Sequence, residues 1–109
     1  MANDTFIGNW NLYMGYYDKD YKVTVLTTTA TIEDEHREDG RLTLKLATGL
    51  AAAMKPHRAS EFSELIGSSA NMFSENAIFL ILSKDGKTFH GAVKDSANGS
   101  PQVWWGERQ

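Results

Sequence analysis

Histidines and carboxylates are the residues of this chain that could hold a metal ion or move a proton. The histidines are His36, His57 and His90, and they form no His-x-His or His-x-x-x-His pair. Zinc needs several such ligands held close together, so a zinc site is not predicted. The acidic run 33–40 around His36 could bind a hard cation, but it lacks the ligand spacing of an EF-hand. A solvated charged turn is the simpler interpretation, and we predict neither a metal site nor a cofactor.

Sequence motifs for covalent or phosphoryl-transfer chemistry are also missing. The Gly-x-Ser-x-Gly turn that presents a nucleophilic serine does not occur, and neither does a P-loop or a Gly-x-Gly-x-x-Gly fingerprint. The chain contains no cysteine, which excludes thiolate nucleophiles and disulfides. We therefore favour a non-catalytic protein over an enzyme, although a carboxylate pair brought together by the fold stays open.

Aromatic residues are the clearest indication of a binding function. The chain has four tyrosines, all close to one predicted turn at 18–20, and two adjacent tryptophans, Trp104 and Trp105. Neighbouring residues of a strand point to opposite faces, so one tryptophan should fill the core and the other should be exposed or lie in an interface. Packing in the core is the simpler role for such rings. The candidate ligand-binding residues are Tyr13, Tyr16, Tyr17, Phe62, His90 and Trp105.

These residues must be positioned by β-strands, because hydrophobic residues recur with a period of two along most of the chain. The clearest case is 41–48, where leucines alternate with polar residues, as in an antiparallel sheet with one face in water. Asp-Gly pairs at 39–40 and 85–86 are typical of hairpin turns. The alternation lapses between Val25 and Leu26, which predicts a bulge in that strand.

The segment 49–76 shows no period of two and contains alanines, a proline and small polar residues. Ser60 could cap a short helix near 60–66, and an irregular strand is the alternative. We expect this segment to form a closing loop or lid. It matches no known family pattern.

The whole pattern predicts an all-β protein of six to eight short antiparallel strands. Closure into a small up-and-down barrel removes the edges along which such strands would aggregate, and a sandwich is the alternative. The 109 residues suit a single domain, residues 1–109.

Two short motifs stand at the ends of the chain, Gly8-x-Trp10 at the first strand and Trp104-x-Gly106-x-Arg108 at the last. This pair of motifs resembles the calycin barrels, the group of lipocalins, fatty-acid-binding proteins and avidins. In that group a tryptophan of the first strand packs against an arginine near the chain end and closes the barrel base. The resemblance implies this closing role for Gly8, Trp10, Gly106 and Arg108. The biotin-binding pattern of avidins is not matched, so no ligand is implied.

Charge and composition narrow the choice of partners. The formal net charge is −3 and the basic residues are scattered singly, so a nucleic-acid partner is not expected. The longest apolar run, 77–82, is too short to span a bilayer, and the N-terminus lacks a signal-peptide pattern. We expect a cytoplasmic protein with no membrane partner. A homodimer is compatible with the small net charge.

The leading hypothesis is a non-catalytic barrel that holds a small apolar or amphipathic ligand inside or at its mouth. Eight strands can enclose one small ligand, whereas fewer strands leave only packed side chains. The alternative is a protein- or carbohydrate-interaction module, inhibitor-like or lectin-like, that uses exposed aromatic residues and the 49–76 segment. The partner is accordingly a small molecule or another protein.

Overall fold

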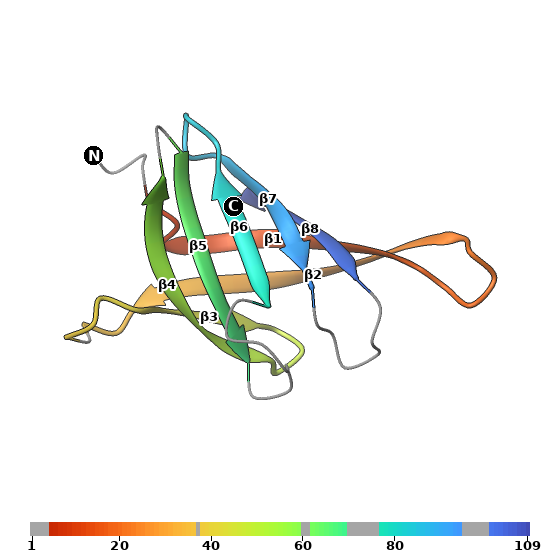
Figure 1. Cartoon of the computed structure of the whole chain (residues 1–109), viewed down its shortest axis with the longest axis horizontal. Coiled ribbons are helices and arrows are strands. Elements are labelled where there is room, and N and C mark those ends of the chain that lie inside the picture. Colours follow the sequence, from red (N-terminus) through yellow and green to blue (C-terminus); the bar gives the residue numbers. More distant parts are fainter. Residues whose placement is uncertain (1–4, 37, 60–61, 70–76, 95–100) are drawn as a thin grey trace.

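The computed structural model is an all-β protein in which eight antiparallel strands form one closed up-and-down barrel (Figure 1). It describes residues 5–36, 38–59, 62–69, 77–94 and 101–109. The strands are β1 (Gly8–Tyr17), β2 (Val23–Asp34), β3 (Leu42–Leu46), β4 (Ala51–Ala59), β5 (Phe62–Ser69), β6 (Ile78–Leu82), β7 (Thr88–Val93) and β8 (Gln102–Arg108). Each strand pairs with its neighbours in the chain, and β8 pairs with β1 to close the barrel. The prediction of a small antiparallel barrel is confirmed.

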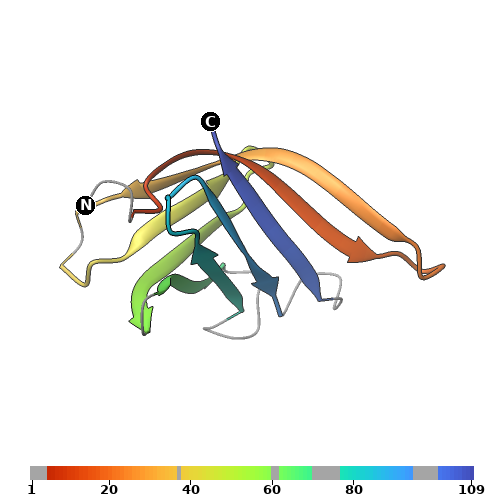
Figure 2. The ribbon, with the colours of Figure 1, turned by 90° about the horizontal axis from the view of Figure 1, so that it is seen from above.

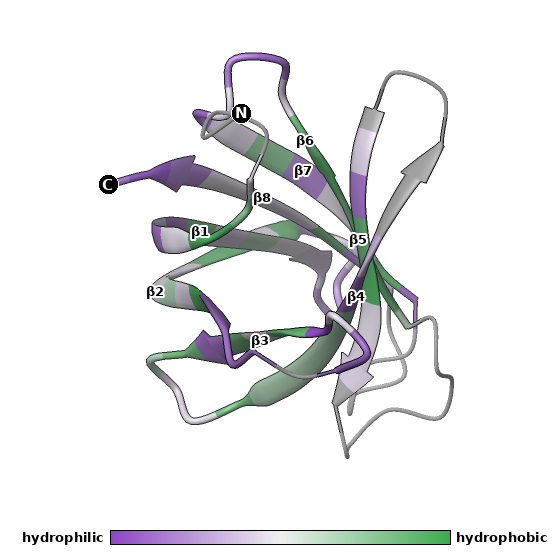
Figure 3. Cartoon of the chain, turned by 90° about the vertical axis from the view of Figure 1, so that its left-hand side faces the viewer, coloured by the Kyte–Doolittle hydropathy of each residue, from purple (hydrophilic) through white to green (hydrophobic). Residues whose placement is uncertain are grey.

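The barrel interior is filled by side chains from almost every strand. Hydrophobic and hydrophilic residues alternate along strands such as β7, so that one set faces inward (Figure 3). Several inward side chains have essentially no exposed surface: Trp10, Leu12, Leu44, Met54, Leu65 and Leu80. A void wide enough for water beside these side chains would expose part of them. The middle of the barrel therefore leaves no room for a ligand in contact with these residues.

Two strands, β4 and β5, occupy most of the segment that was expected to be a loop or lid. They pair over Ala52–Ala59 and Phe62–Ser69, so the helix predicted near 60–66 is wrong; Ser60 itself lies outside the described residues. The period of two is hidden in β4 because alanines occupy both of its faces. Ala52 is buried in the core, whereas Ala53 on the opposite face is half-buried. Within the described residues no helix is long and apolar enough to cross a membrane.

The β1–β2 hairpin extends well beyond the barrel wall (Figure 1). The two strands pair without interruption from Gly8 and Ile32 to Tyr17 and Val23, so the predicted bulge is wrong. β8 accompanies β1 only as far as Gly15, and β3 accompanies β2 only over Ala30–Asp34. The alternation of hydrophobic and polar residues lapses near Val25, where the hairpin consists of two strands alone. Neither face of this ribbon is buried, so neither face has to be apolar.

Candidate binding surface

The base of the barrel is closed by a contact between Trp10 and Arg108. The guanidinium carbon of Arg108 lies 4.2 Å from the centroid of the Trp10 ring, within the range of a cation–π interaction. Three nitrogens of the same guanidinium donate hydrogen bonds of 2.7–2.9 Å to backbone carbonyls, those of Thr5, Ile7 and Gly86. Arg108 thus joins the first strand, the β6–β7 turn and the end of the chain.

Two glycines make this close approach sterically feasible. Gly8 has a φ of +142°, and a Cβ at this position would lie 2.5 Å from Nη1 of Arg108. A Cβ at Gly106 would overlap the ring of Phe89, which packs edge-on against Trp10 with ring centroids 4.7 Å apart. The base around Trp10 is therefore packed and internally hydrogen-bonded.

Three of the predicted binding residues come together on the outer wall of the barrel. His90, Trp105 and Tyr13 lie opposite one another on β7, β8 and β1. The rings of Tyr13 and Trp105 stack with their centroids 5.6 Å apart and their planes 12° apart. Trp104 points the other way into the core and is buried. The two adjacent tryptophans therefore divide between core and surface, although Tyr13 covers part of Trp105.

The other predicted residues do not join this row. Tyr16 lies on the inner face of the β1–β2 hairpin near the barrel mouth and is half-buried, whereas Tyr17 is exposed on the outer face. Phe62 pairs with Ala59 at the start of β5, and its side chain lies outside the described residues. The predicted residues therefore belong to several surfaces rather than to one site.

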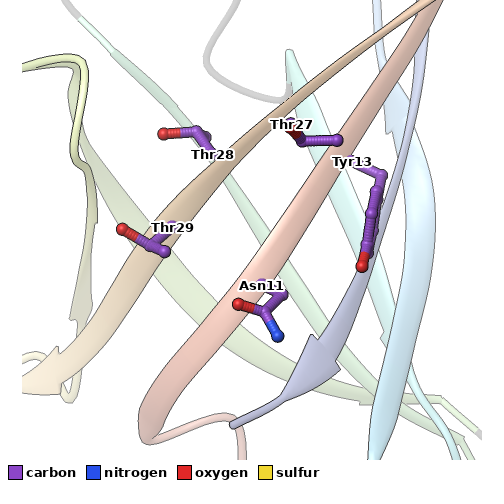
Figure 4. A pocket seen from close by; sticks show the side chains of 5 residues that line it. All are labelled: Asn11, Tyr13, Thr27, Thr28 and Thr29. Carbon is purple, nitrogen blue, oxygen red and sulfur yellow. The ribbon is translucent and has the colours of Figure 1, made fainter.

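A shallow hollow lies beside Tyr13, close to the point where β3 diverges from β2 (Figure 4). It has a volume of about 510 Å³ and is lined by Asn11, Tyr13, Thr27, Thr28 and Thr29. Amide, phenol and hydroxyl groups surround it, and no lining residue is charged. This hollow could not be predicted from the sequence, because runs of threonine are common in β-strands. It is the pairing of Asn11 with Thr29 and of Tyr13 with Thr27 that groups these side chains.

Exposed apolar side chains concentrate on the projecting hairpin and on the adjoining start of β8. Among the described residues, the large exposed hydrophobic side chains here are Tyr17, Tyr21, Val23, Val25, Leu26 and Val103, while Ile7 lies near the base. Tyr21 is 87% exposed and has a φ of +61° in the turn that joins the two strands. Asp18 holds this turn by accepting hydrogen bonds from the backbone N–H groups of Asp20 and Lys22.

The acidic residues at the end of β2 and just after it form surface ion pairs. Nζ of Lys45 lies 3.1 Å from a carboxylate oxygen of Glu33 and 3.6 Å from one of Glu35. The hydrogen bond and negative charge of Glu33 raise the pKa of this exposed lysine. The described residues contain no group of three or more potential metal ligands.

Comparisons of the chain with protein-family models, with curated proteins and with solved structures give no match. The likeness to calycin barrels stays a resemblance carried by Gly8, Trp10 and the segment 104–108. The choice between binding functions depends on the surfaces described above.

Proposed function

We propose that the chain is a non-catalytic protein-interaction module that binds its partner through the outer face of the β1–β2 hairpin and the start of β8. One observation carries this proposal: the exposed apolar side chains on this face are contiguous. Gly15 pairs with both Val25 and Val103, and Tyr17 pairs with Val23. The exposed fractions of Tyr17, Val23, Val25 and Val103 are 65%, 68%, 46% and 58%. Contiguous exposed apolar surface of this kind typically marks an interaction site.

The chemistry of this face indicates the kind of partner. Val23–Ile32 contains no charged residue, and the charges of the projecting part of the hairpin lie in the turn at 18–22. Tyrosine supplies a large contact area with a polar tip and is enriched in protein interfaces. A protein partner with an apolar patch and few charges would complement this face.

A small apolar or amphipathic ligand at the barrel mouth is the second candidate, and Leu26 favours it. Leu26 and Tyr16 lie on the inner face of the hairpin, which continues the barrel interior past Met14. Met14 is 8% exposed, whereas Leu26 is 50% exposed. A ligand would cover Leu26 at the mouth rather than enter the middle of the barrel, which side chains already fill.

Matched variants of the two hairpin faces test this proposal. The outer-face variant combines Tyr17→Ser with Val23→Thr, and the inner-face variant is Leu26→Thr. Each purified chain is immobilised, source-cell extract is passed over it, and retained proteins are quantified by mass spectrometry. We expect a protein retained by the wild type and the inner-face variant but lost from the outer-face variant. Titration of that purified partner should then show at least a tenfold weaker Kd for the outer-face variant, or about 1.4 kcal/mol.

Binding of a fluorescent lipophilic probe tests the second candidate function, a ligand at the barrel mouth. If the probe binds the wild type, loses its binding in Leu26→Thr, and no protein depends on the outer face, the mouth rather than the outer face is the binding surface. The substituted side chains are exposed, so the unfolding midpoints of both variants should stay close to that of the wild type.

A further inference from the structure

Along the projecting hairpin, one side of β2 has no backbone hydrogen-bonding partner among the described residues. The carbonyl of Thr29 accepts a 2.9 Å hydrogen bond from the N–H of Ala47, so Thr29 faces β3. Successive residues of an antiparallel strand bond to opposite neighbours. Val23, Val25 and Thr27 therefore direct their N–H and C=O groups to the side of β3, but β3 pairs with β2 only over Ala30–Asp34. No other described strand pairs with this edge.

This edge lacks the protections that usually prevent strand addition. Charged side chains, proline and bulges commonly block a free edge. Val23–Thr28 contains no charge and no proline, and its pairing with β1 has no bulge. Most of its residues are β-branched and suit an extended strand.

The free edge of β4, which lies beyond the other end of β3, is blocked. β4 pairs with β3 only as far as Met54, and the next residues are Lys55 and Pro56. Leu46 donates its N–H to the carbonyl of Leu50, which shows that even-numbered residues of β4 face β3. Pro56 faces the same side, so the edge lacks a donor at the place where a new strand would add. The sequence therefore blocks strand addition at the free edge of β4 but not at that of β2.

We propose that a second copy of this chain adds to the β2 edge, with the two β2 strands antiparallel and a two-fold axis at Val25. In this register Val25 lies opposite its own equivalent and Val23 lies opposite Thr27 of the second copy. Each such pair exchanges two N–H···O bonds, so all the free groups of Val23, Val25 and Thr27 are satisfied in both copies. The inference goes beyond the proposed function and does not depend on it, because it uses backbone groups rather than the outer side chains.

A second copy fits this edge better than an unrelated strand for three reasons. The two-fold axis brings the uncharged residues Val23–Thr27 opposite one another and Lys22 opposite Thr28, so no like charges meet. The hairpin projects from the barrel, which leaves space for the second copy to approach its edge (Figures 1 and 2). The same register brings the exposed Tyr21 of the second copy opposite Thr29, beside the hollow next to Tyr13. A symmetric dimer forms an isologous interface of this kind.

Analytical ultracentrifugation over a range of concentrations tests the dimer, with two substitutions of Val25. Val25→Pro removes the outward N–H but leaves the bonds to β1, which even-numbered residues of β2 make. Val25→Thr keeps the N–H and serves as the matched control. We expect the wild type and Val25→Thr to approach twice the monomer mass as concentration rises, and Val25→Pro to remain monomeric with an unchanged near-ultraviolet circular dichroism spectrum. A monomeric wild type, or a dimer indifferent to Val25→Pro, would overturn the proposal.

A charge-swap pair tests the register without depending on the fold of the proline variant. Val25→Lys and Val25→Glu each place like charges opposite one another across the two-fold axis, so each should be monomeric alone. Mixed in equal amounts, they should form a heterodimer, and failure to do so contradicts the register at Val25. If the wild type stays monomeric but binds an extended peptide at this edge, the occupant is not a second copy and the proposal is wrong. Tyr17→Ser should leave the dimer intact, which separates this result from a failure of the proposed function.

Discussion

The two ends of the β1–β2 hairpin share one continuous register but differ in what packs against them. Near Trp10, β8 and β3 flank the pair, and its inner face lies against the core. Near Tyr17 neither neighbour is present (Figure 2), and Tyr17, Val23 and Leu26 are exposed. Backbone pairing is therefore the same at both ends, while burial is not. Burial comes from neighbouring strands, so one end stabilises the fold and the other is free to bind.

The largest loss of stability is expected for a substitution at the base of the barrel. Trp10→Ala should lower the free energy of unfolding by about 3–5 kcal/mol, because it removes a fully buried ring and leaves a cavity against Phe89. Urea denaturation followed by circular dichroism measures this change. A nearly unchanged free energy of unfolding would show that the base does not stabilise the barrel.

A smaller loss is expected for Arg108→Lys. Lysine keeps the charge but cannot stack as a plane on Trp10 while donating to three carbonyls, so we expect a loss of about 1–3 kcal/mol. The control is Arg41→Lys, since Arg41 is half-exposed and forms a surface ion pair with Asp39. Equal losses in these two variants would contradict the special role of Arg108.

The turn at 83–87, next to the base, should make a small, pH-dependent contribution. A backbone hydrogen bond from Lys87 and a side-chain hydrogen bond from Ser83 lower the pKa of Asp85 from its ordinary value of 3.8. Because the pKa of Asp85 is lower in the folded protein, the ionised carboxylate stabilises the folded state at pH values above the ordinary pKa of 3.8. This stabilisation is lost as the pH falls through the lowered pKa. Asp85→Asn should therefore flatten the decrease of Tm between about pH 5 and about pH 2. An unchanged profile would show that this carboxylate does not contribute.

The smallest effect is expected at the projecting end. Leu26→Ala should change the free energy of unfolding by less than about 0.5 kcal/mol, because half of the side chain is already exposed. Leu12→Ala, on the same alternating face but fully buried, should cost about 2–5 kcal/mol in the same urea titration. Similar losses for Leu12 and Leu26 would mean that the projecting end is packed in solution.

A large part of the fold could be predicted from the alternation of apolar and polar residues along the chain. The leucines of β3 and the apolar residues of β6 and β7 occur where a barrel strand needs them, and these strands lie close to the expected positions. The strands within 49–76 could not be predicted, because alanine occurs on both the buried and the exposed face and so shows no alternation of hydrophobicity. The candidate surface was only partly predictable. Tyr13, His90 and Trp105 were selected as single residues, and the register between β7, β8 and β1 brings them together.

Outside 49–76, the sequence alone predicts which side chains alternate, where several turns lie and which residues could close the base at Trp10 and Arg108. These are local properties, or pairs of unusual residues, and they can be recognised without coordinates. Only the tertiary structure decided where β3 and β8 stop accompanying the β1–β2 pair. That boundary depends on how eight strands of unequal length close into a barrel, which no local pattern records. For this reason Leu26, which shares its face with the buried Ile32, lies in solvent at the projecting end.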